Sequence, residues 1–102
     1  MIPLIEQHRG SLAPFCRKYH VARLEVFGSA AEQEDNDSAG DIDFLVTFQS
    51  GADLGPADQY FGLLADLQQL FERPVDLVCA DAMRNPYFIR EVDRSRSTLY
   101  AA

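Results

Sequence analysis

Residues 40–48 read GDIDFLVTF, and their alternation defines the centre of the predicted sheet. Apolar residues occupy every second position from Ile42 to Phe48, which is the period of a β-strand with one buried face. The same period places Asp41 and Asp43 together on the other face, with Cα atoms about 6.6 Å apart. We therefore predict a core strand that carries two acidic side chains on one side.

The flanking segments alternate between strand and helix patterns. Two further strands are indicated by runs rich in branched apolar residues: VARLEVF at 21–27 and VDLV at 75–78. Apolar residues at helical spacing indicate three helices: residues 2–19, the segment from Pro56 to Arg73-Pro74, and the segment that follows Asn85-Pro86. This order predicts α/β layers, with helices packed against a small mixed sheet.

Two segments fit more than one structure. Pro14 lies inside the first helical pattern and predicts either a kink or a new start capped by Ser11, because proline removes a backbone hydrogen bond. Residues 97–100, STLY, fit a last edge strand or a tail. Because the sequence shows no repeat or linker, we expect a single domain over residues 1–102.

The composition is that of a soluble globular protein. Sixteen acidic and nine basic residues give a formal net charge of -7, which disfavours direct binding to nucleic acid. Cys16 and Cys79 do not have the spacing of a zinc site, and we expect reduced thiols. The chain has no recognisable secretory leader or membrane-spanning run, which predicts a cytoplasmic protein without a membrane partner.

Three acidic residues and a Gly-Ser pair are the candidates for chemistry. Adjacent carboxylates such as Asp41 and Asp43 repel each other unless a cation lies between them, and Mg²⁺ suits them because water and phosphate oxygens complete its shell. Asp76 lies in an apolar strand, where a metal would offset the cost of burying its charge. Gly28-Ser29 follows a strand directly, where backbone amides and a hydroxyl can hold phosphate.

Each of these features alone is also typical of a solvated strand face or an ordinary turn. If the strands at 40–48 and 75–78 are neighbours, however, three carboxylates converge on one sheet face. Such a group is enough to bind two metal ions about 3.5–4 Å apart, which can activate an attacking oxygen and stabilise a leaving phosphate.

Together these features resemble the minimal nucleotidyltransferases (MNT) of the DNA polymerase β-like superfamily. The resemblance is carried by LEVFGSA at 24–30, GDIDFLV at 40–46 and VDLV at 75–78, and the layout agrees over nearly the whole chain. It implies a polymerase β-like nucleotidyltransferase fold. It also implies that Gly28 and Ser29 bind the nucleotide triphosphate, and that the catalytic, Mg²⁺-binding residues are Asp41, Asp43 and Asp76.

Small members of this family are commonly antitoxins encoded beside a HEPN-domain ribonuclease toxin. The resemblance therefore implies transfer of AMP from ATP to a tyrosine of such a toxin, within a hetero-oligomer. Ala30-Ala31-Glu32 stand where the family usually shows Ala-Arg-Gly. This departure supports an alternative, in which the chain is a non-catalytic antitoxin that neutralises its toxin by binding alone.

A third interpretation concerns residues 35–43, DNDSAGDID, which resemble the start of a calcium-binding EF-hand loop. Ala39 has no side-chain oxygen for the fifth position of such a loop. Val46 stands where a bidentate glutamate should close it. The ligand set therefore disfavours calcium.

Overall fold

The computed structural model describes residues 1–36, 40–50 and 53–102. Its elements confirm the predicted alternation of helices and strands, and two short helices add to it. In chain order they are α1 (Pro3–Lys18), β1 (Val21–Phe27), α2 (Ser29–Glu32), β2 (Ile42–Phe48), α3 (Pro56–Phe71), β3 (Val75–Cys79), the 3-10 helix η2 (Ala80–Ala82), α4 (Pro86–Ser95) and β4 (Ser97–Ala101).

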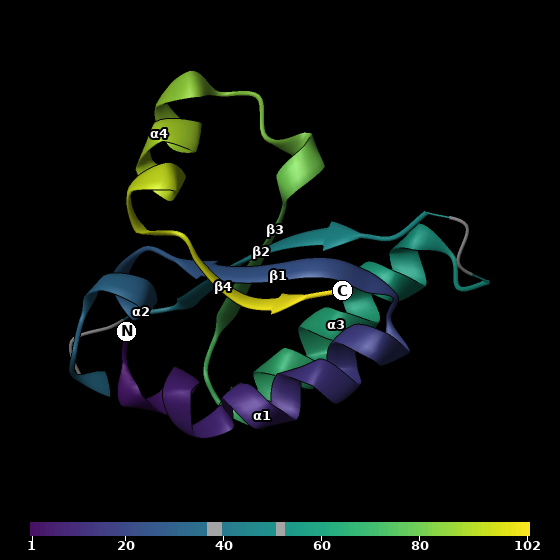
Figure 1. Ribbon diagram of the computed structural model, residues 1–102, viewed down its shortest axis with the longest axis horizontal. Helices are drawn as coiled ribbons and strands as arrows, with labels where there is room; N and C mark the ends of the chain where they lie inside the picture. Colours follow the sequence, from purple (N-terminus) through teal and green to yellow (C-terminus); the bar gives the residue numbers. More distant parts are fainter. Residues whose placement is uncertain (37–39, 51–52) are drawn as a thin grey trace.

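The four strands form one mixed sheet in the order β3-β2-β1-β4. Strand β1 pairs antiparallel with both β2 and β4, whereas β2 and β3 are parallel. Residues 97–101 are therefore an edge strand rather than a tail. Figure 1 shows α1 and α3 together on one face of this sheet and α4 on the other.

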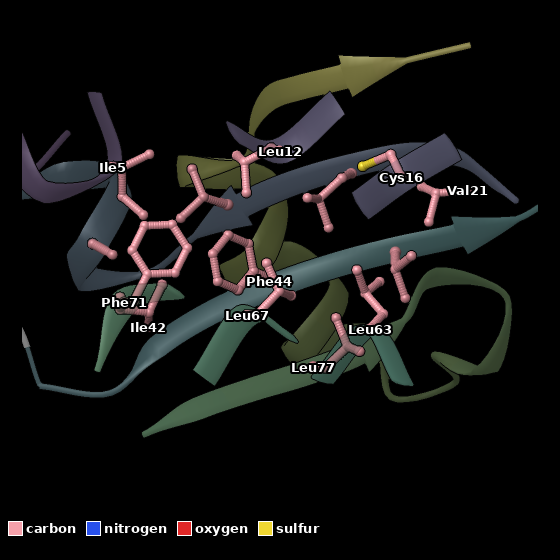
Figure 2. Close-up of a cluster of buried hydrophobic side chains, with 14 of the residues drawn as sticks. Ile5, Leu12, Cys16, Val21, Ile42, Phe44, Leu63, Leu67, Phe71 and Leu77 are labelled. Atoms are coloured by element: carbon pink, nitrogen blue, oxygen red, sulfur yellow. The ribbon is translucent and has the colours of Figure 1, made fainter. Parts of the chain in front are cut away.

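The main core lies between the sheet and helices α1 and α3. Strand β2 contributes Ile42, Phe44 and Val46 to it, as the alternation predicts, while Phe48 at the strand end is only partly buried. Figure 2 shows side chains of both helices around Phe44, including Leu12, Leu67 and Phe71. A smaller cluster, Phe27, Leu45 and Val92, lies on the opposite face under α4.

The start of α4 has the predicted cap. Asn85 Oδ1 accepts hydrogen bonds from the backbone amides of Tyr87 and Phe88, at 2.9 and 3.4 Å, and Pro86 occupies the first helical position. These bonds satisfy amides that have no partner inside the helix.

Of the two alternatives predicted at Pro14, the new helix start is wrong. The helix runs without a break from Pro3 to Lys18, so it does not start again at Ser11. Pro14 and Gly10 are both exposed. The Gly10 carbonyl, which loses its helical donor to the proline, can therefore be hydrated, and this lowers the cost of keeping the helix continuous.

No helix among the described residues has the length and apolar character that crossing a membrane requires.

Candidate active site

Asp43 lies on the sheet face that α4 overlooks. Its neighbours in β2, Ile42 and Phe44, belong to the main core. Leu45, two residues further along, packs with Val92 of α4 instead. Because side chains alternate along a strand, Asp43 shares the face of Leu45.

The strand pairing brings Asp76 beside Asp43. In the parallel pair of β2 and β3, Asp43 and Asp76 occupy matching positions. The two strands that carry these aspartates are therefore neighbours, as convergence of the carboxylates requires. On the other side Phe27 is the antiparallel partner of Asp43, so the chain reaches Gly28 at the same end of the sheet.

Asp43 is influenced electrostatically by both of the other predicted acidic residues. Burial, and then the negative charges of Asp76 and Asp41, raise the pKa of Asp43 from its ordinary value of 3.8 to about 6. A bound cation would remove the repulsion between these charges. Asp41 precedes β2 and is exposed. Asp76 is also exposed, in the edge strand β3, so the predicted cost of burying its charge does not arise.

Gly28 makes a close approach to this carboxylate. Its backbone has φ 69° and ψ -148°, and a Cβ added there would lie 2.7 Å from Asp43 Oδ2. Only glycine fits both the positive φ and the lack of space. The Gly28 carbonyl also accepts hydrogen bonds from the amides of Ala31 and Glu32, both at 3.1 Å, which close the first turn of α2.

Ser29 is the first residue of α2 and is partly exposed. The sequence predicted a turn at Gly28-Ser29 but not the short helix that follows it. The first amides of a helix have no partner within it, so they remain available to a phosphate group. The position of Ser29 is therefore compatible with the predicted triphosphate site.

A residue that the sequence did not single out also contacts this turn. The amide of Gly28 donates a hydrogen bond to Ser95 Oγ at 2.8 Å. Ser95 is the last residue of α4. Nothing in the sequence pattern predicts this contact, because it joins residues far apart in the chain.

The donor chemistry of the site fits Mg²⁺. This ion usually binds proteins through one or two carboxylates and takes its other ligands from water and phosphates. In the described parts of the chain, no three His, Cys, Asp and Glu side chains are grouped closely enough to hold a metal ion. Asp43 and Asp76 are register partners, and the charges of Asp76 and Asp41 both act on Asp43. Metal ligation by all three residues stays a prediction.

Two other interpretations can be compared with the structure. Asp37 and Ala39 of the suggested calcium loop lie outside the described residues. Its second half coincides with β2, whose Ile42 is fully buried, and this does not suit a ligand loop. The two thiols are free; burial raises the pKa of Cys16 to about 12, which keeps this thiol protonated and unreactive.

One hollow of the surface lies elsewhere. A cavity of about 470 Å³ lies where β2 ends and α3 begins, and its lining includes Phe48, Leu54 and Gln59. Asp53 is the single charged residue among those that line it. This cavity is at the opposite end of β2 from Asp43, so it does not include the predicted site residues.

Comparisons with known proteins identify the family of the chain. A family model described as polymerase beta, nucleotidyltransferase matches residues 11–102. A relative from Methanocaldococcus jannaschii, named "Putative protein adenylyltransferase MJ0128", is 36% identical over 76 residues, which cover 74% of each chain. A second protein of the same organism and type, MJ0126, is 27% identical over 90 residues, or 88% of this chain and 85% of its own.

Solved structures share the fold. One described as "Structure of putative minimal nucleotidyltransferase" has a TM-score of 0.70 and 26% identity, covering 91% of this chain and 90% of its own. A tri-AMPylated HEPN toxin of Shewanella oneidensis in complex with its MNT antitoxin contains a chain with a TM-score of 0.64 and 17% identity, covering 95% and 72%. A toxin-antitoxin structure with AMP-PNP contains a chain with a TM-score of 0.65 and 19% identity. The match covers 92% of this chain and 73% of that one.

Proposed function

The chain belongs to the polymerase β-type nucleotidyltransferase family, and we propose that it is a Mg²⁺-dependent protein adenylyltransferase that acts as the antitoxin of a HEPN-type ribonuclease toxin. In the proposed reaction a tyrosine hydroxyl of the toxin attacks the α-phosphorus of ATP. A bond forms between the tyrosine oxygen and this phosphorus, the bond from the α-phosphorus to the bridging oxygen breaks, and pyrophosphate leaves with the electron pair. The tyrosine proton passes to a base.

Two sets of comparisons support this proposal. The curated relatives carry protein adenylyltransferase names. Among the structures with the same fold, one contains an AMPylated HEPN toxin together with an MNT antitoxin. The low identity to that antitoxin means that the likeness shows the fold, and the nature of the partner is our inference.

The observation that carries the proposal is the position of Asp43. It lies between Asp76 of the neighbouring strand and the backbone of Gly28, at the end of the sheet where α2 begins. A phosphate-binding turn and a pair of carboxylates therefore meet at one place. Phosphoryl transfer needs this combination, because the triphosphate must be positioned while the charge on its oxygens is neutralised.

The residues of the site then have the following roles. The amide and hydroxyl of Ser29, together with the backbone of Gly28, hold the triphosphate. Asp41 and Asp43 would hold the Mg²⁺ that accompanies the nucleotide. Asp76 lies beside Asp43 and, with it, faces the acceptor hydroxyl and accepts its proton. When bound, Mg²⁺ supplies positive charge that stabilises the oxygens of the transferred phosphoryl group.

A contact-only antitoxin is the second candidate, and one observation favours it. Ala31 and Glu32 follow the phosphate-binding turn, so α2 carries an exposed acid where the family usually has arginine and glycine. A negative charge near a triphosphate weakens binding. In this case the acidic chain would neutralise a basic toxin by complementary charge alone.

The experiment that separates the two candidates compares Asp43→Asn with the matched control Asp53→Asn, an exposed aspartate at the other end of β2. The proteins encoded beside this chain's gene are each incubated with each variant and Mg²⁺-ATP, and their intact masses are measured. We expect a mass gain of whole AMP units with wild type and Asp53→Asn, and none with Asp43→Asn.

Protection from the toxin is then measured in cells. If Asp43→Asn forms the complex and protects as well as wild type does, AMP transfer is not the mechanism and the contact-only function stands. Loss of protection with the complex intact supports transfer.

A further inference from the structure

We propose that Ser95 is a positioning residue for the nucleotide site, which it serves by fixing the peptide of Gly28. Its Oγ accepts the hydrogen bond of the Gly28 amide at 2.8 Å. Gly28 leads directly into the first turn of α2, where the triphosphate is proposed to bind. This inference rests on the proposed function, because it assigns Ser95 a part in nucleotide binding.

The hydrogen bond acts on the residue with the greatest conformational freedom at the site. Glycine populates positive and negative φ about equally, so the φ of 69° at Gly28 must be selected by its surroundings. On the carbonyl side the selection comes from the amides of Ala31 and Glu32. On the amide side Ser95 is the partner. The two sets of bonds together fix both peptide planes of Gly28, and with them the direction of the first amides of α2.

The Ser95 hydroxyl is itself held in place, because the end of α4 is anchored to β1. Arg96 Nε and Nη2 each donate to a carboxylate oxygen of the buried Glu25 at 2.8 Å, and Arg96 Nη1 donates to Asp93 at 2.8 Å. One turn earlier, Val92 is buried against Phe27. Figure 1 shows α4 passing into β4, which lies beside β1.

These anchors distinguish Ser95 from an ordinary surface serine. An arginine that binds a carboxylate with two parallel hydrogen bonds has a defined orientation, since its planar guanidinium fits only one way. The residue next to it in the chain is fixed as a consequence. The tip of α4 thus presents one hydroxyl to one amide, and that amide belongs to the phosphate-binding turn.

The test uses the full chain and three variants. Ser95→Ala removes the acceptor, and Ser95→Thr keeps a hydroxyl. The control Ser11→Ala makes the same change at an exposed position of α1, on the other side of the sheet. Thermal unfolding first verifies that each variant is folded at the temperature of the assays.

The first measurement needs no nucleotide. Hydrogen exchange of the Gly28 amide is followed by NMR, and we expect it to be faster in Ser95→Ala than in wild type, Ser95→Thr and Ser11→Ala. The second measurement is the Kd of Mg²⁺-ATP by calorimetry. Loss of one neutral hydrogen bond predicts a Kd about 3- to 10-fold higher in Ser95→Ala. In AMP transfer, KM should rise with it while kcat changes less, and threonine should restore both the Kd and the KM.

The outcomes separate this proposal from the proposed function. Unchanged exchange of the Gly28 amide in Ser95→Ala would overturn the contact. Faster exchange with an unchanged Kd would show that the hydrogen bond is only structural, and would overturn the positioning role while the proposed function stands. If wild type itself does not bind Mg²⁺-ATP, the proposed function fails and the role of Ser95 in nucleotide binding fails with it.

Discussion

Replacement of Asp43 with asparagine should stabilise the ligand-free protein at neutral pH and abolish its response to Mg²⁺-ATP. In the folded chain, burial and the neighbouring charges of Asp76 and Asp41 raise the pKa of Asp43 from 3.8 to about 6. The unfolded chain lacks these effects, so ionisation of Asp43 reduces the free energy of unfolding. The folded-state pKa is the higher one, so protonation of Asp43 favours the folded state. This contribution to the free energy of unfolding is complete below pH 3.8 and is lost as the pH rises through about 6.

The magnitude follows from the two pKa values. The difference between 3.8 and about 6 corresponds to about 3 kcal/mol when solvent screening is ignored. Asp43 is partly exposed, and screening reduces this to about 1 kcal/mol. For a domain of this size, that is an increase in Tm of about 4–8 °C.

The assay is urea and thermal unfolding of wild type, Asp43→Asn and the exposed control Asp53→Asn. The free energy of unfolding of Asp43→Asn should exceed that of wild type by a margin that grows as the pH rises from about 4 to about 7. Asp53→Asn should have the same free energy of unfolding as wild type at each pH. Mg²⁺-ATP at 100 times its Kd should stabilise wild type by about 2.7 kcal/mol and reverse the order. If Asp43→Asn is less stable than wild type at neutral pH, or if its advantage does not depend on pH, the electrostatic argument is refuted.

Two further substitutions test the surroundings of the site. Gly28→Ala should lower the free energy of unfolding in urea titrations by about 1–3 kcal/mol, because Gly28 has a positive φ and no space for a Cβ. The control Gly10→Ala has no atom within 4 Å of the new Cβ and should raise the free energy of unfolding by about 0.5–1 kcal/mol. Equal effects of the two would contradict the close approach. Arg96→Ala leaves Glu25 buried without its main partner and should lower the free energy of unfolding by about 2–4 kcal/mol. The control Arg94→Ala breaks an exposed ion pair and should lower it by less than about 1 kcal/mol. The pKa of Glu25 is lowered mainly by its hydrogen bonds from Arg96, so the contribution of this pair should be present at neutral pH and be lost as the pH falls through the folded-state pKa. A cost that persists unchanged in acid would contradict this.

The larger elements were predictable because each carries a strong local pattern. The alternation from Ile42 to Phe48 specifies both the strand and its buried face, and the Asn85-Pro86 pair specifies the start of α4. The two short helices were not predicted. Helix α2 has four residues and depends on the conformation of Gly28, which the structure around it imposes.

The site was predictable where it depends on strand period and not where it depends on contacts between distant segments. The sheet face of Asp43 follows from the alternation alone, whereas Asp41 precedes β2 and is exposed. The match of Asp43 with Asp76 depends on the order of the strands, which no local pattern predicts. No local pattern indicates the contacts that connect the end of α4 to the strand β1 and the turn after it. These are the hydrogen bond of Gly28 with Ser95 and the buried ion pair of Glu25 with Arg96.

The relative influence of the two other aspartates on Asp43 gives a direct test of the site geometry. After burial, Asp76 is the larger cause of the raised pKa of Asp43, and Asp41 is the smaller. Asp76→Asn should therefore lower the pKa of Asp43 more than Asp41→Asn does, and each should lower it without restoring 3.8, because burial remains.

The measurement is an NMR titration of the Asp43 side-chain carbon without metal, with Asp53→Asn as the control that should leave its pKa unchanged. If Asp41→Asn has the larger effect, the carboxylate nearest to Asp43 is its neighbour along the chain rather than its partner in β3. In that case Asp76 does not belong to the site. A pKa near 3.8 in wild type would mean that Asp43 is exposed to water, and the argument for a shared cation site would no longer hold, since three separately hydrated carboxylates have no repulsion for a cation to relieve.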